Sequence, residues 1–272
     1  MALKGPAMAQ ALYGHVDYRP SDDLDVWIHP GDFAKASGIM ESLGFTPLVS
    51  LSTDEARAHM QAGWDRGYRS PAGDYVVELC TGMAPSYFAR PPEVDVFWAG
   101  AQELTLEGGR VRTPGPEALL ELLCLHGTKH GWSRLLWVAD VAALGGAKGG
   151  IDWAALSHLT NRHGTERMTA LGFSLARVYL GADIPWKPAP VALVQRASRF
   201  LSGRERCAGS RQEMGFHLAA RERWRDRARY VVLALFMPGF GDWRWVRLPR
   251  SLFGLYWILR PFRLLRGGGN KI

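Results

Sequence analysis

The chain of 272 residues has little cysteine and no long hydrophobic run. Its three cysteines, Cys80, Cys124 and Cys207, lie far apart and form no Cys-x-x-Cys pair. This spacing argues against a disulfide framework and a thiolate zinc site, and it favours a reducing compartment. The longest apolar run, residues 230–237, is far shorter than the roughly 20 residues that span a bilayer. Residues 1–6 lack the apolar core of a signal peptide, so we expect a cytoplasmic protein.

Internal repeats are also absent, as are low-complexity tracts other than the three glycines at 267–269. The glycine-rich stretch 145–150 lacks the GxxxxGK[ST] order of a phosphate-binding loop and follows no predicted strand. We therefore interpret it as a connection between helices.

Acidic residues are scarce at the end of the chain. The whole chain has a formal net charge of +7, from 33 Lys and Arg against 26 Asp and Glu. From Arg196 onward, 17 Lys and Arg stand against 5 Asp and Glu, a net +12, so the preceding residues carry a net −5. This asymmetry indicates two regions with different surfaces.

The first 113 residues alternate helical and strand patterns, as expected of an α/β or α+β domain. They predict helices at 7–13 and 31–43, strands at 24–28 and 45–51, and hairpins formed by 64–69 with 74–80 and by 103–112. Pro114 and Pro116 mark a boundary. Beyond it the apolar spacing predicts helices at 119–129, 134–144, 153–163, 165–180 and 189–201. We therefore predict one domain at 1–113 and a helical domain at 114–272.

The strongest chemical signal is a pair of aspartates. Asp23 and Asp25 lie two residues apart in a predicted strand, so their side chains point to the same face. Like charges buried side by side are costly, and a divalent cation such as Mg²⁺ or Mn²⁺ commonly stabilises them. Glu78, in an otherwise apolar strand, would supply a third carboxylate. The alternative interpretation is that Asp23 caps a turn and Glu78 faces solvent.

The order of these parts resembles the DNA polymerase β-like nucleotidyltransferase superfamily, and within it a poorly characterised bacterial group. The resemblance rests on a Lys-Gly turn, a helix ending in Leu-Tyr, an Arg and an Asp-hydrophobic-Asp motif, here Lys4, Gly5, Leu12, Tyr13, Arg19, Asp23 and Asp25. It continues through Glu78 into residues 125–140 and 248–261. The resemblance implies an α+β fold, a mixed sheet with flanking helices followed by a helical C-terminal region.

The same resemblance implies a chemistry. A nucleoside monophosphate would move from a nucleoside triphosphate such as ATP to a hydroxyl or similar acceptor on a small molecule, peptide or protein. Asp23, Asp25 and Glu78 would be catalytic and would hold Mg²⁺ or Mn²⁺. Gly5 and the helix after it would approach the triphosphate. Lys4 and Arg19 would neutralise phosphate charge.

Two histidines in the helical region suggest a second type of site. His126 and His130 have a zinc-compatible spacing, but Gly127 stands where a metalloprotease needs a Glu. We instead expect Lys129, His130 and Arg134 to form a basic helix face that binds the nucleotide or the acceptor. A solvated face with one buried histidine is an equally open interpretation.

A second class of function also stays open. Pro6 follows Gly5 where the superfamily has a serine, which favours a catalytically inactive accessory or peripheral membrane protein. The Arg- and Trp-rich tail from residue 221 has three interpretations, namely packing on the core with a solvated basic face, membrane contact through residues 248–265, and, last, nucleic-acid binding. In the second, Arg260 and Arg263 belong to the basic side of the segment.

Overall fold

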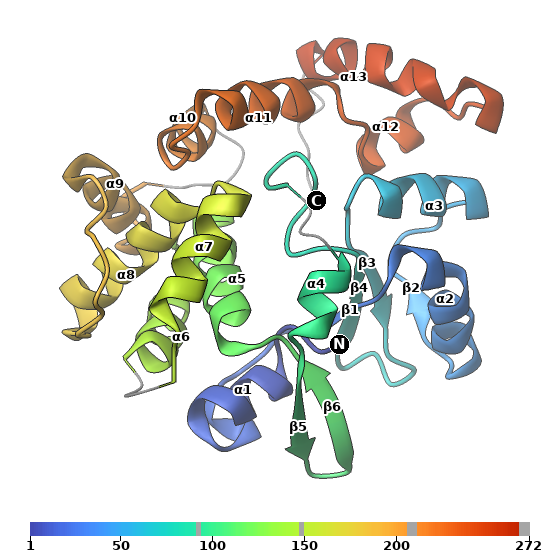
Figure 1. Cartoon of the computed structure of the whole chain (residues 1–272). Coiled ribbons are helices and arrows are strands. Elements are labelled where there is room, and N and C mark those ends of the chain that lie inside the picture. Colours follow the sequence, from blue (N-terminus) through green and yellow to red (C-terminus); the bar gives the residue numbers. More distant parts are fainter. Residues whose placement is uncertain (91–93, 147–149, 206–210, 267–272) are drawn as a thin grey trace. The chain divides into compact units, whose positions relative to one another are not determined.

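The computed structural model describes residues 1–90, 94–146, 150–205 and 211–266 (Figure 1). The chain packs into two compact units, Met1–Pro114 together with Val231–Ile272, and Gly115–Tyr230. The division predicted at residues 113 and 114 stays a prediction, and in the structure residues 231–272 group with the first unit. Cys207, three residues of the glycine-rich connection and the three glycines at 267–269 lie outside the described residues.

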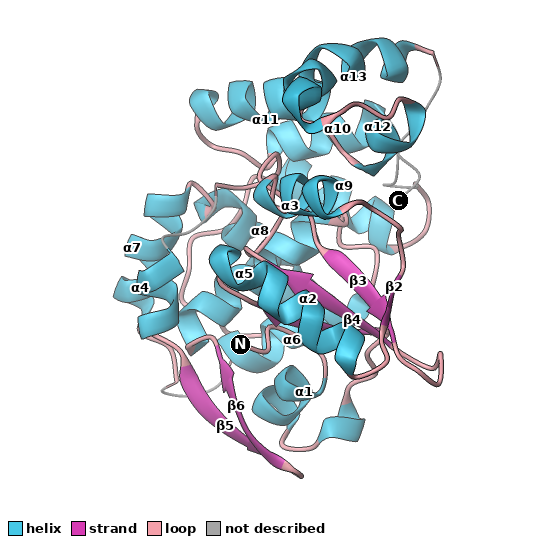
Figure 2. Ribbon diagram, turned by 90° about the vertical axis from the view of Figure 1, so that its right-hand side faces the viewer, coloured by secondary structure: helices cyan, strands magenta, loops and turns pink. Residues whose placement is uncertain are grey.

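A four-stranded mixed sheet forms the centre of the first unit, in the order β1-β4-β3-β2 (Figure 2). Its strands are β1 (Asp23–Trp27), β2 (Thr46–Pro47), β3 (Arg66–Arg69) and β4 (Val76–Cys80). β1 and β4 are parallel, and the other pairs are antiparallel. The strand predicted at 45–51 shortens to two residues at the sheet edge, where Pro47 has no N–H to donate. Both predicted hairpins form, the second as β5 (Gln102–Leu106) and β6 (Gly109–Thr113).

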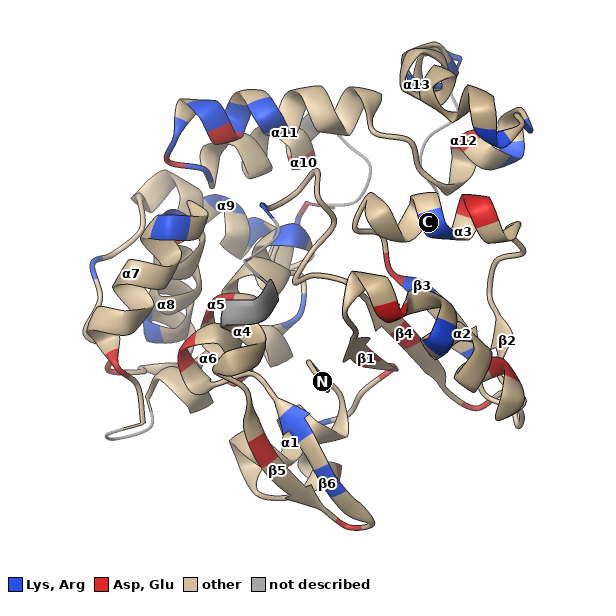
Figure 3. Cartoon of the chain, turned by 45° about the vertical axis from the view of Figure 1, so that its right-hand side comes forward, with Lys and Arg blue, Asp and Glu red and all other residues tan. Residues whose placement is uncertain are grey.

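The helices of the first unit come from both ends of the chain. The N-terminal part contains α1 (Pro6–Tyr13), α2 (Phe33–Ser42), α3 (Thr53–Gln61) and α4 (Val94–Ala99), with short 3₁₀ helices at Val16–Tyr18 and Pro30–Asp32. The C-terminal part contains α12 (Phe240–Trp245), the 3₁₀ helix η3 (Arg250–Leu255) and α13 (Tyr256–Leu265). Basic positions lie on α12 and in the segment that follows it (Figure 3), at Arg244, Arg247 and Arg250. The indole of Trp64 donates a 3.0 Å hydrogen bond to the carbonyl of Pro238 and ties the two parts together.

The structure corrects one expectation for the tail. Arg260 and Arg263, which the membrane-contact interpretation assigns to the basic side of the segment, are buried. Their guanidinium groups lie 2.8 and 2.5 Å from the carboxylate of Asp242, which is itself buried. A buried carboxylate needs cationic partners, and these two arginines provide them.

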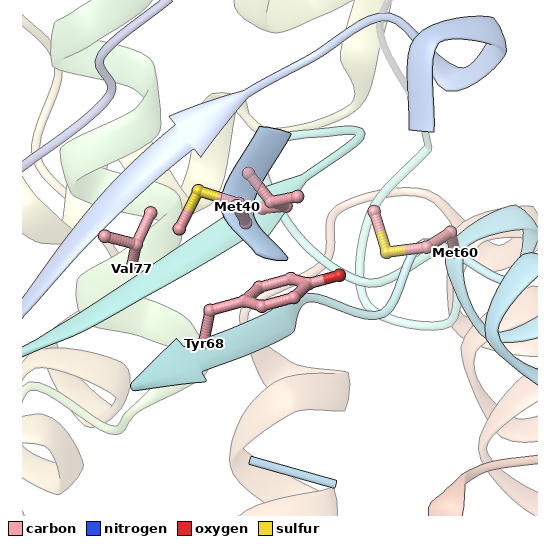
Figure 4. Close-up of a cluster of buried hydrophobic side chains, with 5 residues drawn as sticks. Met40, Met60, Tyr68 and Val77 are labelled. Carbon is pink, nitrogen blue, oxygen red and sulfur yellow. The ribbon is translucent and has the colours of Figure 1, made fainter. Parts of the chain in front are cut away.

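One face of the sheet carries the core of the first unit. Met40, Met60, Tyr68, Val77 and Leu79 form a buried cluster, in which α2 and α3 each supply a methionine (Figure 4). Helix α3 is missing from the sequence prediction, although the capping box of Ser52 with Glu55 signals its start. The apolar side chains of β1, Leu24 and Val26, pack against the same cluster.

The second unit is helical. It contains α5 (Pro116–Lys129), α6 (Leu135–Gly145), α7 (Trp153–His163), α8 (Glu166–Leu180), α9 (Val191–Leu201), α10 (Arg211–Ala219) and the first part of α11 (Trp224–Phe236). The five helices predicted here are confirmed to within three residues. The ring of buried Trp132 leaves no room for a side chain at two glycine positions, because a Cβ on Gly127 or Gly172 would lie 2.6 or 2.9 Å from it. None of the helices formed by the described residues is long and apolar enough to cross a membrane.

Two histidines, buried His217 and partly buried His59, make stability dependent on pH. Burial lowers the pKa of His217 to about 3 and that of His59 to about 4. The His217 ring lies 2.9 Å from the hydroxyl of Tyr230 and 3.1 Å from the carbonyl of Lys129. Unfolding restores a pKa near 6.5, so the unfolded chain binds more protons below that pH.

We predict that each histidine lowers the free energy of unfolding as the pH drops from about 6.5 towards 4, by up to about 1.4 kcal/mol per pH unit. Glu78, whose pKa is raised to about 7, acts in the opposite direction and offsets part of this fall. Urea titrations across this range measure it. His217→Gln should reduce the slope, and the exposed control His15→Gln should not. An unchanged slope in His217→Gln would contradict the account.

Candidate active site

The structure brings the three predicted carboxylates to one face of the sheet. Leu24 pairs with Val77 across the parallel strands, and both lie on the core side. The intervening positions therefore face the other way, and these are Asp23, Asp25 and Glu78. Asp25 and Glu78 are direct register partners. Adjacent strands lie about 4.8 Å apart, so these two carboxylates are neighbours.

Lys4 lies against this acidic face. Its Nζ is 2.9 Å from Oδ2 of Asp25, which is only 3% exposed. The backbone holds the lysine there, because the N–H of Leu3 donates to the carbonyl of Asp25 at 2.9 Å and Ala2 forms an antiparallel bridge with Val26. Burial, the largest single influence, lowers the pKa of Lys4, but the charge of Asp25, the hydrogen bond to Asp25 and the charges of Asp23 and Cys80 together raise it above its usual value.

The carboxylates nevertheless outnumber this cation and repel one another. Burial, then the charges of Asp65, Asp25 and Asp23, raise the pKa of Glu78 to about 7. Burial and Asp25 also raise the pKa of Asp23, and Lys4 offsets part of this effect. An additional cation would relieve the repulsion and favour the charged carboxylates. Such strongly perturbed groups are typical of functional sites.

Asp65 is a site residue that the sequence prediction lacks. It precedes β3 by one residue, and among the charged groups it has the largest effect on Glu78. A signal was present, because Gly67 pairs with Glu78 in the predicted hairpin and Asp65 is two residues from Gly67. Cys80 lies next to the site, with Sγ 3.8 Å from Oδ1 of Asp25, and burial raises its pKa so that it stays a neutral thiol.

Gly5 and Arg19 lie beside Asp23. Gly5 has a φ of 81°, and a Cβ there would lie 2.9 Å from Cδ2 of Leu24 and 3.3 Å from the carbonyl oxygen of Asp23. Only glycine fits this close approach to β1, and α1 begins at the next residue. Arg19 is buried, donates to Oγ of Ser21 at 3.2 Å, and lowers the pKa that Asp23 would otherwise have.

The three basic residues predicted in the helical region lie in the second unit. Lys129 ends α5, and the ring of His130 lies 4.7 Å from that of His126. Arg134 precedes α6, with its guanidinium 5.8 Å from the ring of Trp137. The acidic site consists of first-unit residues, so a role for these three in binding stays a prediction.

Comparison with known proteins identifies a family to which this chain is similar. The profile of a family described as uncharacterised nucleotidyltransferase matches residues 1–181, a span that contains the whole acidic face. The chain belongs to this nucleotidyltransferase family. Its membership confirms the resemblance to an uncharacterised nucleotidyltransferase family over residues 1–181 and the α+β nucleotidyltransferase fold. No curated protein and no solved structure matches the chain.

Two carboxylates of this site have the chemistry to bind a metal ion together with other ligands. Within the described ranges, no three His, Cys, Asp or Glu side chains are arranged to hold a metal ion by themselves. Mg²⁺ at phosphate-transfer sites is usually bound by one or two carboxylates, substrate phosphates and water. Asp23 and Asp25 fit that pattern as a pair of hard oxygen donors. Because Lys4 contacts Oδ2 of Asp25, a metal ion at that oxygen would have to displace its ammonium group.

The variant Lys4→Met tests whether the ammonium group of Lys4 and a metal ion compete for the same position beside Asp25. The variant leaves Asp25 buried beside like charges, so we predict a loss of about 3–5 kcal/mol in the free energy of unfolding without metal. Mg²⁺ should restore more stability to the variant than to the wild type, because it no longer competes with an ammonium group. Urea unfolding with EDTA and with Mg²⁺ measures both effects.

The control is Lys35→Met, which removes an exposed lysine from α2. It should change neither the stability nor the response to Mg²⁺. The shared position is ruled out if Lys4→Met responds to Mg²⁺ no more than the wild type does.

Proposed function

We propose that this protein transfers a nucleoside monophosphate from a nucleoside triphosphate to an acceptor hydroxyl or similar group, with Mg²⁺ or Mn²⁺ as cofactor. Membership of a nucleotidyltransferase family supports the general reaction. The observation that carries the proposal is the register of β1 with β4, which sets Glu78 beside Asp25. On this basis Asp23, Asp25 and Glu78 are the catalytic carboxylates.

Asp23 and Asp25 would hold the metal ion that accompanies the triphosphate. Such an ion neutralises phosphate charge and polarises the α-phosphate. Lys4 would leave Asp25 and pair with a phosphate oxygen, so that two cations do not compete for one carboxylate. Arg19 would add positive charge from beside Asp23. Gly5 allows a close backbone approach next to the start of α1, where N–H groups favour anions.

Glu78 would act at the acceptor. The resemblance predicts that it helps to hold a second ion, and its pKa of about 7 also suits proton acceptance near neutral pH. The acceptor oxygen forms a bond to the α-phosphorus, and its proton passes to the Glu78 carboxylate. The bond from that phosphorus to the bridging oxygen breaks, and pyrophosphate leaves with the electron pair.

A catalytically inactive relative, acting as an accessory protein, is the alternative. Its support is the ion pair of Lys4 with Asp25, because an internal ammonium group can replace a metal ion as the counter-charge. The Pro that follows Gly5 favours the same alternative. A hydroxyl or similar group as the acceptor and a cytoplasmic location stay predictions.

Nucleotide binding separates the two functions. We predict that a triphosphate with Mg²⁺, at about one hundred times its Kd, stabilises the protein by about 2.7 kcal/mol and raises the melting temperature by roughly 5 °C. Thermal unfolding with ATP, GTP, CTP and UTP measures the shift, and EDTA should abolish it. If none of the four raises the melting temperature, the accessory function is favoured.

Asp25→Asn tests catalysis. It keeps the side-chain shape but removes the charge that would hold the metal ion, so we predict at least about a 100-fold loss of transfer, equivalent to about 2.7 kcal/mol. Pyrophosphate release with a pool of hydroxyl-bearing acceptors measures turnover. The control Asp22→Asn changes the exposed neighbouring carboxylate and should retain activity.

A second variant guards against a folding defect in Asp25→Asn. Glu78→Gln should lose turnover as well, because an amide can neither take up the proton of the acceptor nor supply the charge that would help to hold an ion. Full turnover in either variant removes that residue from the mechanism.

A further inference from the structure

Helix α13 turns its basic side inward and its apolar side outward. Its buried residues are Tyr256, Arg260 and Arg263, spaced as one helical face. A surface helix normally has the opposite arrangement, with the apolar stripe against the core. In α13 that stripe is exposed.

A buried cluster fixes this orientation. The carboxylate of Asp242 accepts three hydrogen bonds. The donors are Nη1 of Arg260 at 2.8 Å, Nε of Arg263 at 2.5 Å and the backbone N–H of Gly239 at 2.8 Å. Arg260 also donates to the carbonyl of Ala234. If the helix rotated to bury its apolar side, Asp242 would remain buried without its two arginine partners. The cluster therefore holds the apolar side outward.

The outward side is a continuous apolar stripe. Ile258, Phe262 and Leu265 follow one another at helical spacing and are 59%, 58% and 84% exposed. Leu255, at the end of η3, extends the stripe by one turn, and Trp257 flanks it. Contiguous exposed apolar side chains of this size mark an interaction surface.

The charge around the stripe indicates what it binds. Residues 243–272 contain six arginines and one lysine but no Asp or Glu. Arg244, Arg247, Arg250 and Arg266 are exposed, and Arg250 also lies 3.3 Å from Asp54 on α3. Arg266 lies 5.9 Å from the ring of exposed Trp245. The exposed stripe is apolar and is surrounded by cations. It therefore complements a partner surface in which apolar chains lie beneath negatively charged groups.

We propose that α13 and η3 form a docking surface for a membrane that contains anionic lipids. The stripe of Leu255, Ile258, Phe262 and Leu265 enters the boundary between headgroups and acyl chains, and the arginines contact lipid phosphates. Trp257 and Trp245 have the amphipathic side chains that are typical of this depth. This proposal is independent of the transferase activity, because none of these residues belongs to the acidic site.

Co-sedimentation of the full-length protein with vesicles tests the proposal. Vesicles of phosphatidylcholine with phosphatidylglycerol should bind the protein at low salt, and high salt should weaken the binding. Vesicles of phosphatidylcholine alone should bind it much less. Ile258→Ser combined with Phe262→Ser should lower the partition coefficient about tenfold or more.

Both substituted side chains are exposed, so the variant is expected to fold, and circular dichroism checks this. The matched control Val178→Ser removes an exposed apolar side chain from α8 and should bind as the wild type does. Equal binding to both vesicle types, no binding to either, or unchanged binding by the double variant overturns the proposal. A wild-type dimer in solution that the double variant converts to a monomer also overturns it, because a second copy would then cover the stripe.

Discussion

A buried carboxylate with too few cations around it is the constraint on which the rest of the first unit depends. Asp25 is almost completely buried, beside Asp23 on its own strand and Glu78 on the next. Lys4, at 2.9 Å from Asp25, and Arg19, beside Asp23, are outnumbered by the carboxylates, and burial followed by repulsion from Asp65, Asp25 and Asp23 raises the pKa of Glu78. The close approach of Gly5 to β1 and the pairing of residues 1–3 with that strand bring the lysine into place.

A second buried carboxylate shows the opposite balance. Asp242 accepts hydrogen bonds from two arginines, and one of its oxygens also accepts a hydrogen bond from a backbone N–H. This cluster has no need of a further cation, so it acts as a structural clamp for the tail. The acidic face has more carboxylates than cations, so it attracts one from outside. The balance of charge thus distinguishes a candidate site from a structural ion pair.

Local patterns in the sequence predicted most elements of the fold. Apolar and polar residues alternate around Asp23 and Asp25, and apolar residues recur at helical spacing after residue 116. Both patterns involve residues close together in the sequence, so one sequence is enough to detect them. The contact of Glu78 with Asp25 depends on a parallel pairing between distant strands, which local periodicity does not contain. The sequence therefore suggested three acids in one site only from the isolated charge of Glu78 in an apolar strand and from a family resemblance. Asp65 was missed although the predicted hairpin, in which Gly67 pairs with Glu78, already places it near Glu78.

Helix α13 shows where periodicity misleads. Its apolar stripe predicts a buried face and its arginines a solvated one, yet Asp242 reverses both. The reason is energetic, because leaving a buried carboxylate without cations costs more than exposing a few apolar side chains. The pairing of Asp242 with residues about twenty positions further on is a tertiary contact, so no local pattern signals it.

The most direct test of the central claim is a crystal structure with Mn²⁺ and a triphosphate analogue that cannot be cleaved at the α-phosphate. Anomalous scattering would locate the ion. The account predicts Mn²⁺ bound to Asp23 and Asp25, with the ammonium of Lys4 moved away from Asp25 to a phosphate oxygen. Lys4 still paired with Asp25, and no manganese at the two aspartates under saturating conditions, would contradict it.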